Sequence, residues 1–353
     1  MEVNVLNDIK KKKRSKNKGG EESRPIVDDE SPVKVADVDI NKTVKDFKDL
    51  LYAKLNLSSQ ISRSRLGVML SLKKDDKEIK TFLSDDFQNL LFYDGVSDSN
   101  AIFHLKDIGP QINYRLVYVL EYLGPLVFSI LFFIRYAFIY TKNNPNKNLQ
   151  THVVCYFFMT FFHYIKRILE SIYVHIFSRT TMPLSNLFKN CAYYWGIFGI
   201  LCGYTLFNPY GKDLTFLKIP RYFFIMFFFS AELKNLRTHM ILRDIKIKGK
   251  GKKYMPPKVD GFELVTCANY MWEFFAWISF SIFSLNPFVV LFTICGFLQM
   301  KQWALRKHHD MKKAYGDKYS KEIFAFIPYF VWVNLKIIKY KIIIITSKNI
   351  SNK

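Results

Sequence analysis

The stretch His163-Tyr-Ile-Lys-Arg-Ile-Leu-Glu170 places a dense set of ionisable side chains in an otherwise apolar part of the chain. The apolar run Val153–Phe162 directly precedes it, and together they approach the roughly 20 residues with which a helix crosses a membrane. Charged groups are costly at membrane depth unless they line a site. The stretch therefore predicts a membrane-embedded helix that carries part of a functional site, as in a membrane enzyme.

The composition predicts a charged, soluble part joined to an apolar, helical part. Half of the 353 residues are hydrophobic and 17% are aromatic, yet the formal net charge is +22, and the mean hydropathy is close to zero. The apolar runs predict six transmembrane helices at about 114–140, 151–177, 187–208, 216–236, 263–284 and 286–304. A seventh apolar segment, 323–345, contains Pro328 and three lysines, so it crosses the membrane or lies at its surface.

The N-terminal part of the chain is polar. Residues 1–31 contain a lysine run but few apolar residues, which predicts a disordered basic tail. A cleavable signal peptide is not expected, because the chain opens on this basic run, and the first transmembrane helix would serve as the targeting signal.

Residues 32–108 predict a small ubiquitin-like α+β domain. The expected elements are strands at Val33–Val35, Leu66–Leu72 and Ala101–Leu105, a helix at Val44–Leu55, a turn at Lys73–Lys77 and a short helix at Asp85–Leu91. On the long helix, one face carries Val44, Phe47, Leu50, Leu51 and Leu55. This segment contains no catalytic arrangement, so we expect it to fold separately and to position partners.

The charge distribution predicts the orientation in the membrane. Positive charge concentrates in Arg243–Lys258, and cytoplasmic loops carry such an excess. With six crossings, the N-terminus and the tail at 346–353 also lie in the cytosol, and the catalytic helical domain extends over 109–345. The five cysteines lie in or beside the apolar runs without metal-binding spacing, so we expect neither disulfides nor a bound metal.

Polar residues recur at the cytosolic ends of the predicted helices. They are Glu121, Tyr164, Lys166, Arg167, Glu170, Asn235, His239, Arg243, Asn269, Tyr270, Glu273, Lys307, His308, His309 and Tyr315. Tyr164, Arg167 and Ser171 share one helical face. Such a set predicts a pocket for a phosphorylated ligand, with groups for proton transfer, although single members of the set also occur as side chains that merely reach lipid headgroups. No glycine-rich dinucleotide motif follows a strand, so helices and loops would hold a nucleotide.

These residues belong to motifs that resemble the very-long-chain trans-2-enoyl-CoA reductases of the endoplasmic reticulum, within the steroid 5α-reductase family. The resemblance covers about residues 32–335. Its motifs include Asp107–Ile112, Glu121–Pro125, His163–Ser171, Thr181–Asn190, Tyr193–Trp195, Asn235–Arg243, Cys267–Tyr270 with Glu273, and Lys307–His309.

The resemblance implies reduction of the trans-2 double bond of a very-long-chain enoyl-CoA by NADPH, the last step of microsomal fatty-acid elongation. Hydride would go to Cβ and a proton to Cα from a tyrosine. The cofactor would contact Asn235, Arg243, Asn269, Glu273, His308 or His309, and Arg167. Glu121 and Tyr164 match a pair that holds the substrate carbonyl in relatives, and Lys166 and Tyr270 match positions regarded as essential. Tyr270 is the favoured proton donor, and Tyr164 is the alternative.

The resemblance also implies a setting and partners. It implies a multi-pass protein of the endoplasmic reticulum membrane with a cytosolic active site, in contact with membrane lipid and with the condensing enzyme, ketoreductase and dehydratase of elongation, but not with nucleic acid.

Two departures from the family pattern are visible. Ile323 stands where an arginine of an Asp-Tyr-Pro-x-x-Arg element would be, and Ala268 replaces a proline. Three alternatives remain open at this point: a steroid or polyprenol enone reductase, an isoprenylcysteine methyltransferase and a non-enzymatic membrane adaptor.

Overall fold

A computed structural model describes residues 1–9, 32–74, 77–98, 100–140, 150–208, 221–249, 255, 257–319 and 322–328. These residues form two compact units. The first lies within Met1–Glu121, His175–Ala192 and Lys246–Lys252, and the second within Tyr122–Val174, Tyr193–Ile245 and Lys253–Lys353. The domain boundary predicted at residue 108 stays a prediction.

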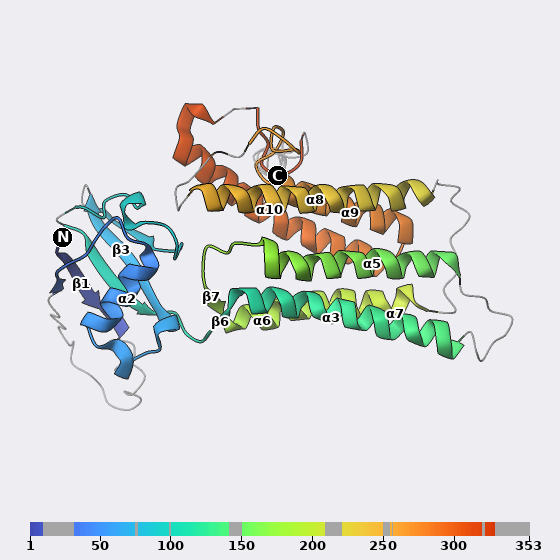
Figure 1. Ribbon diagram of the computed structural model, residues 1–353, viewed down its shortest axis with the longest axis horizontal. Helices are drawn as coiled ribbons and strands as arrows, with labels where there is room; N and C mark the ends of the chain where they lie inside the picture. The colour runs from blue at the N-terminus through green and yellow to red at the C-terminus, as the bar shows by residue number, and fades with distance from the viewer. Residues whose placement is uncertain are drawn as a thin grey trace, which may run out of the picture. The chain divides into compact units, whose positions relative to one another are not determined.

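The first unit contains a five-stranded mixed sheet. Its strands are β1 (Val3–Asn7), β2 (Val33–Val35), β3 (Leu66–Lys74), β4 (Lys77–Phe82) and β5 (Ile102–Asp107), in the spatial order β2-β1-β5-β3-β4. β1 and β5 are parallel, with Val5 opposite Phe103, and the other neighbouring pairs are antiparallel. Helix α2 (Val44–Lys54) contacts this sheet, as Figure 1 shows.

The sequence predicts the core of this unit correctly. Val44, Phe47 and Leu51 are buried, and Leu50 and Leu55 pack against the same core. The Phe47 ring meets the Phe103 ring edge to face at 5.0 Å. Thr43 and Asp46 form a reciprocal capping box that begins α2.

Two local predictions in this unit are wrong. Residues 1–9 were expected within a disordered tail, yet Val3–Asn7 forms β1 because Val3 and Val5 bury their side chains against β2 and β5; residues 10–31 lie outside the described part. The helix expected at Asp85–Leu91 is replaced by a 3₁₀ turn at Leu90–Phe92. Instead, the Asp86 carbonyl accepts from the Lys45 N–H and the Gln88 carbonyl accepts from the Val44 N–H at the start of α2. These bonds take the place of the hydrogen bonds within a helix. Strand β4 was not predicted.

A short second sheet joins β6 (Gln111–Asn113) to β7 (Thr181–Pro183). In the chain, helix α3 (Tyr114–Ile134) follows β6, and helix α6 (Leu184–Cys191) follows β7. Within the first unit, Asp86 also fixes the residues before β7: its Oδ1 accepts from Lys48 Nζ at 2.7 Å, and its Oδ2 accepts from the Thr180 N–H and hydroxyl. Burial alone would raise the pKa of Asp86, but the Lys48 ammonium and the Thr180 donors outweigh burial and lower it.

We expect Asp86→Asn to lower the free energy of unfolding by about 1–3 kcal/mol at neutral pH, because the amide cannot replace the charge that Lys48 pairs with. Because the pKa of Asp86 is lowered in the folded state, its carboxylate contributes its full stabilisation of the fold above the ordinary aspartate pKa of 3.8. This contribution is lost as the pH falls through the folded-state pKa. Thermal unfolding midpoints of wild type and Asp86→Asn should therefore converge below about pH 4. Exposed Asp94→Asn is the control, and a gap that stays constant in acid would contradict the assignment.

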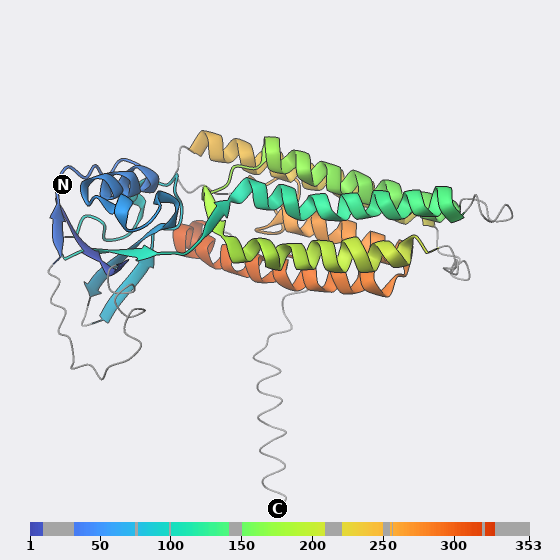
Figure 2. The same cartoon turned by 90° about the horizontal axis from the view of Figure 1, so that it is seen from below.

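The second unit is helical. Its helices are α5 (Thr151–Leu169), α7 (Gly203–Leu206), α9 (Ala268–Ser284) and α10 (Pro287–Tyr315), together with most of α3 and of α8 (Arg221–Gly249), which belongs to this unit through Ile245. It also contains the π-helical turns η4 (Arg135–Tyr140) and η5 (Glu170–Val174), η6 (Ala192–Cys202) from Tyr193 on, and a 3₁₀ turn η7 (Gly316–Lys318). Figures 1 and 2 show its long helices lying lengthwise beside one another.

Glycines allow α3 to pack closely against η6 and the start of α7. A Cβ atom added to Gly124 would lie 2.2 Å from the Trp195 indole, and Cβ atoms on Gly199 and Gly203 would lie within 3 Å of Phe128 and Phe132. Small residues at such positions are typical of helices that associate in membranes.

The described helices overlap all six predicted segments, and the differences in extent that matter for the site are in α8, α9 and α10. Helix α8 continues through Arg243 to Gly249, where a loop was expected. Helix α9 begins at Ala268 instead of residue 263, because residues 261–267 form turns in which Val265 bridges to Phe324 and the Thr266 N–H bonds the Phe324 carbonyl. Helix α10 runs on to Tyr315 and so includes both predicted histidines. Among the described residues, the helical ranges Tyr114–Ile139 and Pro287–Lys318 are long and apolar enough to cross a membrane. Most of the seventh predicted segment lies outside the described residues.

Candidate functional site

One face of α5 carries the ionisable residues that the sequence singled out. His163, Lys166, Arg167 and Glu170 follow the spacing i, i+3, i+4 and i+7, so they share a helical face. All four are buried in the second unit, as are Tyr164 and Ser171. The predicted common face of Tyr164, Arg167 and Ser171 is therefore confirmed.

Helix α8 meets this face with an acidic residue. Glu232 is 1% exposed and pairs through Oε1 with His163 Nδ1 at 2.7 Å and through Oε2 with Lys166 Nζ at 2.8 Å. Lys166 also lies 3.4 Å from Glu170 Oε1, which belongs to its own helix turn. Buried charges persist only when they are paired, and these residues pair with one another, although Glu170 Oε1 and Glu232 Oε2 accept no hydrogen bond from a described residue.

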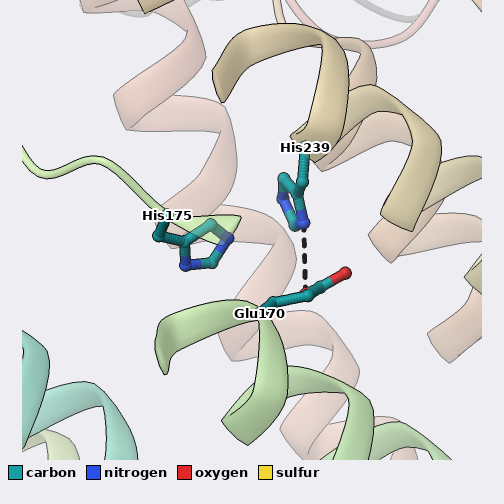
Figure 3. Close-up of side chains that lie close together, drawn as sticks. All are labelled: Glu170, His175 and His239. Atoms are coloured by element: carbon teal, nitrogen blue, oxygen red, sulfur yellow. Dashed lines mark ion pairs between the residues drawn. The ribbon is translucent and has the colours of Figure 1, made fainter. Parts of the chain in front are cut away.

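A second group of contacts surrounds Glu170. Its Oε2 lies 2.7 Å from Arg167 NH1 and 3.2 Å from His239 Nδ1 of α8, and Figure 3 shows the latter pair. Arg167 NH2 donates to the Tyr122 hydroxyl at 2.8 Å. Because Arg167 and Lys166 already bring positive charge to Glu170, a divalent cation on the Glu170–His239 pair would be repelled. The expectation that no metal binds stays a prediction.

Helix α9 joins the network through its first two turns. Asn235 Nδ2 donates to the Asn269 carbonyl at 2.8 Å, and Asn235 Oδ1 accepts from Lys166 Nζ. Glu273 Oε1 lies 3.6 Å from His163 Nε2 and accepts from Trp277 Nε1 at 3.4 Å. Three of the predicted cofactor residues, Asn235, Asn269 and Glu273, thus lie together with Lys166.

Tyr164 lies beside this network in an aromatic cage. Its side chain is 0% exposed, and its ring centroid lies 4.9 Å from that of His163, 5.2 Å from Phe198 and 6.3 Å from Trp277. Within the described residues, its hydroxyl has no hydrogen-bond partner, and the same holds for Arg167 Nε. Buried polar atoms in proteins are nearly always paired, so unpaired ones call for an explanation such as a ligand.

Other predicted residues have separate surroundings. Tyr270 is half-buried against the Trp303 ring at 6.0 Å, and Arg243, on α8, pairs with Asp244. His308 Nδ1 lies 2.6 Å from the Thr266 hydroxyl, and His309 is exposed, as expected for adjacent residues on a regular helix.

Glu121 belongs to the first unit. It is buried, and its Oε2 accepts from Asn190 Nδ2 at 2.8 Å. Its pairing with Tyr164 stays a prediction.

The sequence analysis missed three residues with important contacts: Glu232, Tyr122 and Asn190. Glu232 had a visible signal, because it precedes Asn235 and His239 with the spacing i, i+3 and i+7 on one helical face. Tyr122 and Asn190 stand in the motifs Glu121–Pro125 and Thr181–Asn190, but no helical spacing links them to their partners Arg167 and Glu121.

Comparison with known proteins identifies a family. The family model "3-oxo-5-alpha-steroid 4-dehydrogenase" matches residues 180–332. The chain is 37% identical over 241 residues to the "Probable very-long-chain enoyl-CoA reductase art-1" of Caenorhabditis elegans, covering 67% of this chain and 77% of that protein. It is 34% identical over 288 residues to the "Very-long-chain enoyl-CoA reductase" of Dictyostelium discoideum, covering 81% of this chain and 91% of that protein.

A more distant relative is the human "Trans-2,3-enoyl-CoA reductase-like" protein, which is 30% identical over 243 residues, or 66% of this chain and 65% of that protein. The matches cover most of both chains in the first two relatives, and the residues matched by the family model include α8 and α9. The chain therefore belongs to the membrane-bound steroid 5α-reductase family, among relatives named as enoyl-CoA reductases.

Proposed function

We propose that this protein reduces the trans-2 double bond of very-long-chain enoyl-CoA with NADPH, the final step of fatty-acid elongation. The names of its relatives support the substrate. The structural observation that carries the proposal is the hydroxyl of Tyr164, which is buried beside paired charges and, among the described residues, has no partner of its own.

The chemistry requires a donor at the thioester oxygen and an acid at Cα. A nicotinamide cofactor supplies a hydride when bound. As Cβ is reduced, negative charge develops on the thioester oxygen, and a preorganised donor there contributes on the order of 3–4 kcal/mol. The Tyr164 hydroxyl suits this task because, among the described residues, it is not committed to a protein acceptor. Tyr270 is proposed to deliver the proton to Cα.

The residues present fit a nicotinamide cofactor. Arg167 Nε is a buried donor that has no acceptor among the described residues, and Asn269 and Glu273 occupy the first two turns of α9 beside it in the same network. Arg243 keeps a third of its side chain exposed and suits a phosphate. His308 uses Nδ1 within the protein, so its Nε2 and the exposed ring of His309 are the histidine atoms proposed for the cofactor.

The setting is part of the same proposal. We place six helices across the membrane of the endoplasmic reticulum, with the site facing the cytosol and the other elongation enzymes as partners. The strand order β2-β1-β5-β3-β4 with α2 supports a ubiquitin-like fold for the sheet of the first unit.

The test uses purified full-length protein in detergent, with a long-chain trans-2-enoyl-CoA or an enone steroid as substrate. We expect oxidation of NADPH with the enoyl-CoA only, and a catalytic efficiency at least about tenfold lower with NADH, because a charge-assisted phosphate contact is worth roughly 1.5–3 kcal/mol. Arg243→Gln should remove most of this preference while leaving the NADH rate intact. Faster turnover of the enone steroid would instead assign the chain to the steroid-reducing branch.

A further inference from the structure

The ammonium of Lys166 is surrounded by protein groups. Its side chain is 6% exposed. Nζ donates to the Glu232 carbonyl at 3.4 Å and to Asn235 Oδ1, and it forms ion pairs with Glu232 Oε2 at 2.8 Å and Glu170 Oε1 at 3.4 Å. A buried ammonium held by two carboxylates and two hydrogen bonds within the protein does not suit a group that would donate to a reacting oxygen.

The contact with Lys166 fixes the orientation of the Asn235 side-chain amide. A side-chain amide has an acceptor end and a donor end, and its orientation follows from its hydrogen-bond partners. Because the ammonium attracts the Oδ1 end, the Nδ2 end faces the other way, toward α9. There it donates to the Asn269 carbonyl at 2.8 Å. Both ends of Asn235, which is 1% exposed, are thus used within the protein.

Hydrogen bonds from residues outside α9 hold its first turn in place. Among the described residues, Cys267 at its N-cap makes no side-chain capping bond, so the turn has no local device that fixes its start. Instead it is held from two sides. Asn235 holds Asn269, and Thr266 is bonded through its N–H to the Phe324 carbonyl and through its hydroxyl to His308. This turn carries Tyr270 and leads to Glu273.

We propose that Lys166 is a positioning residue: through Asn235 it holds the first turn of α9, and with it Tyr270, in place for proton transfer. This inference rests on the proposed function for the role of Tyr270, and it gives Lys166 a role without contact with reactants. The chain of contacts is Lys166 Nζ to Asn235 Oδ1 and Asn235 Nδ2 to the Asn269 carbonyl, linking α5, α8 and α9. A small displacement of a catalytic group costs up to about 100-fold in rate.

The experiment breaks each link separately. Lys166→Met removes the ammonium, and Asn235→Asp keeps an acceptor for Lys166 but removes the donor to Asn269. Asn235→Asp adds a carboxylate but keeps the Lys166 ammonium paired, so it still tests the link to α9 if Lys166→Met proves unstable. Lys234→Met is the matched control, since Lys234 is the neighbour of Asn235 on α8 but is 45% exposed and pairs with Asp260.

With saturating NADPH, we expect each variant to lower kcat by about 10- to 100-fold with little change in the KM for enoyl-CoA. The double variant should be no slower than the slower single variant, and Lys166→Met should add nothing to Tyr270→Phe. If the fold reductions in kcat multiplied in these double variants, Lys166 would act on the reactants directly, and the proposal would be overturned. Full kcat in Asn235→Asp would do the same.

Hydrogen–deuterium exchange provides a readout that does not depend on turnover. Peptides covering 268–273 should exchange faster in Lys166→Met and Asn235→Asp than in wild type and Lys234→Met. Unchanged exchange in both variants would refute the positioning role whatever the substrate proves to be. If the two variants exchange faster but the wild-type protein does not reduce enoyl-CoA, the link from Lys166 to α9 is supported and only the proposed function is wrong.

Discussion

Tyr164→Phe lowers enoyl-CoA turnover by at least about 100-fold while the protein stays folded, if the hydroxyl acts on the thioester oxygen. The ring is packed on all sides, and phenylalanine fills the same volume. The hydroxyl is buried, and no described residue bonds to it. Its removal should therefore leave stability unchanged or raise it by roughly 1 kcal/mol, because an unpaired buried polar group is itself unfavourable. Lower activity with equal or higher stability would distinguish a functional hydroxyl from a structural one.

Tyr270→Phe is expected to reduce turnover by a similar factor, about 100-fold, because it removes the proposed acid and retains the contact with Trp303. The assay is NADPH oxidation by detergent-purified protein at saturating substrate, with monodispersity checked by size-exclusion chromatography. Tyr173→Phe is the control, since that side chain is 73% exposed. Near-normal turnover in both Tyr164→Phe and Tyr270→Phe would exclude these hydroxyls as oxyanion donor and acid.

Glu232→Ala is expected to produce the largest loss of stability. It leaves His163 and Lys166 without their shared carboxylate in a buried site, and breaking a buried ion pair from one side costs about 3–5 kcal/mol. Glu232→Gln should cost less, because the amide still offers an oxygen to one of the two partners.

The measurement is the temperature at which half of the detergent-purified protein remains monodisperse after heating. Exposed Asp310→Asn on α10 is the control and should match wild type. If Glu232→Ala were as heat-resistant as that control, the network around Glu232 would not stabilise the second unit.

Periodicity within one segment was sufficient for the predictions that proved correct. Val44, Phe47 and Leu51 follow a helical repeat, and so do Tyr164, Arg167 and Ser171, so their shared faces depend only on the 3.6-residue turn. The six helical segments were visible for a similar reason, because long apolar runs need an intramolecular partner for every backbone polar group, and a helix provides it locally. Their ends were less certain, as α8, α9 and α10 show.

Contacts between segments were decided only by the tertiary structure. Val3–Asn7 is a strand because β2 and β5 offer it partners, and Asp86–Gln88 stays non-helical because its carbonyls pair with α2. The charge of Lys166 predicted a polar site but not the role of this lysine. The sequence pattern is the same whether a lysine in a membrane-embedded helix faces a ligand or protein acceptors. Its role follows from Glu232 and Asn235, which lie more than sixty residues away in the chain. The sequence alone determined which residues share a helix face, because that geometry is local; which faces meet depends on packing between distant helices, and only the folded structure specifies it.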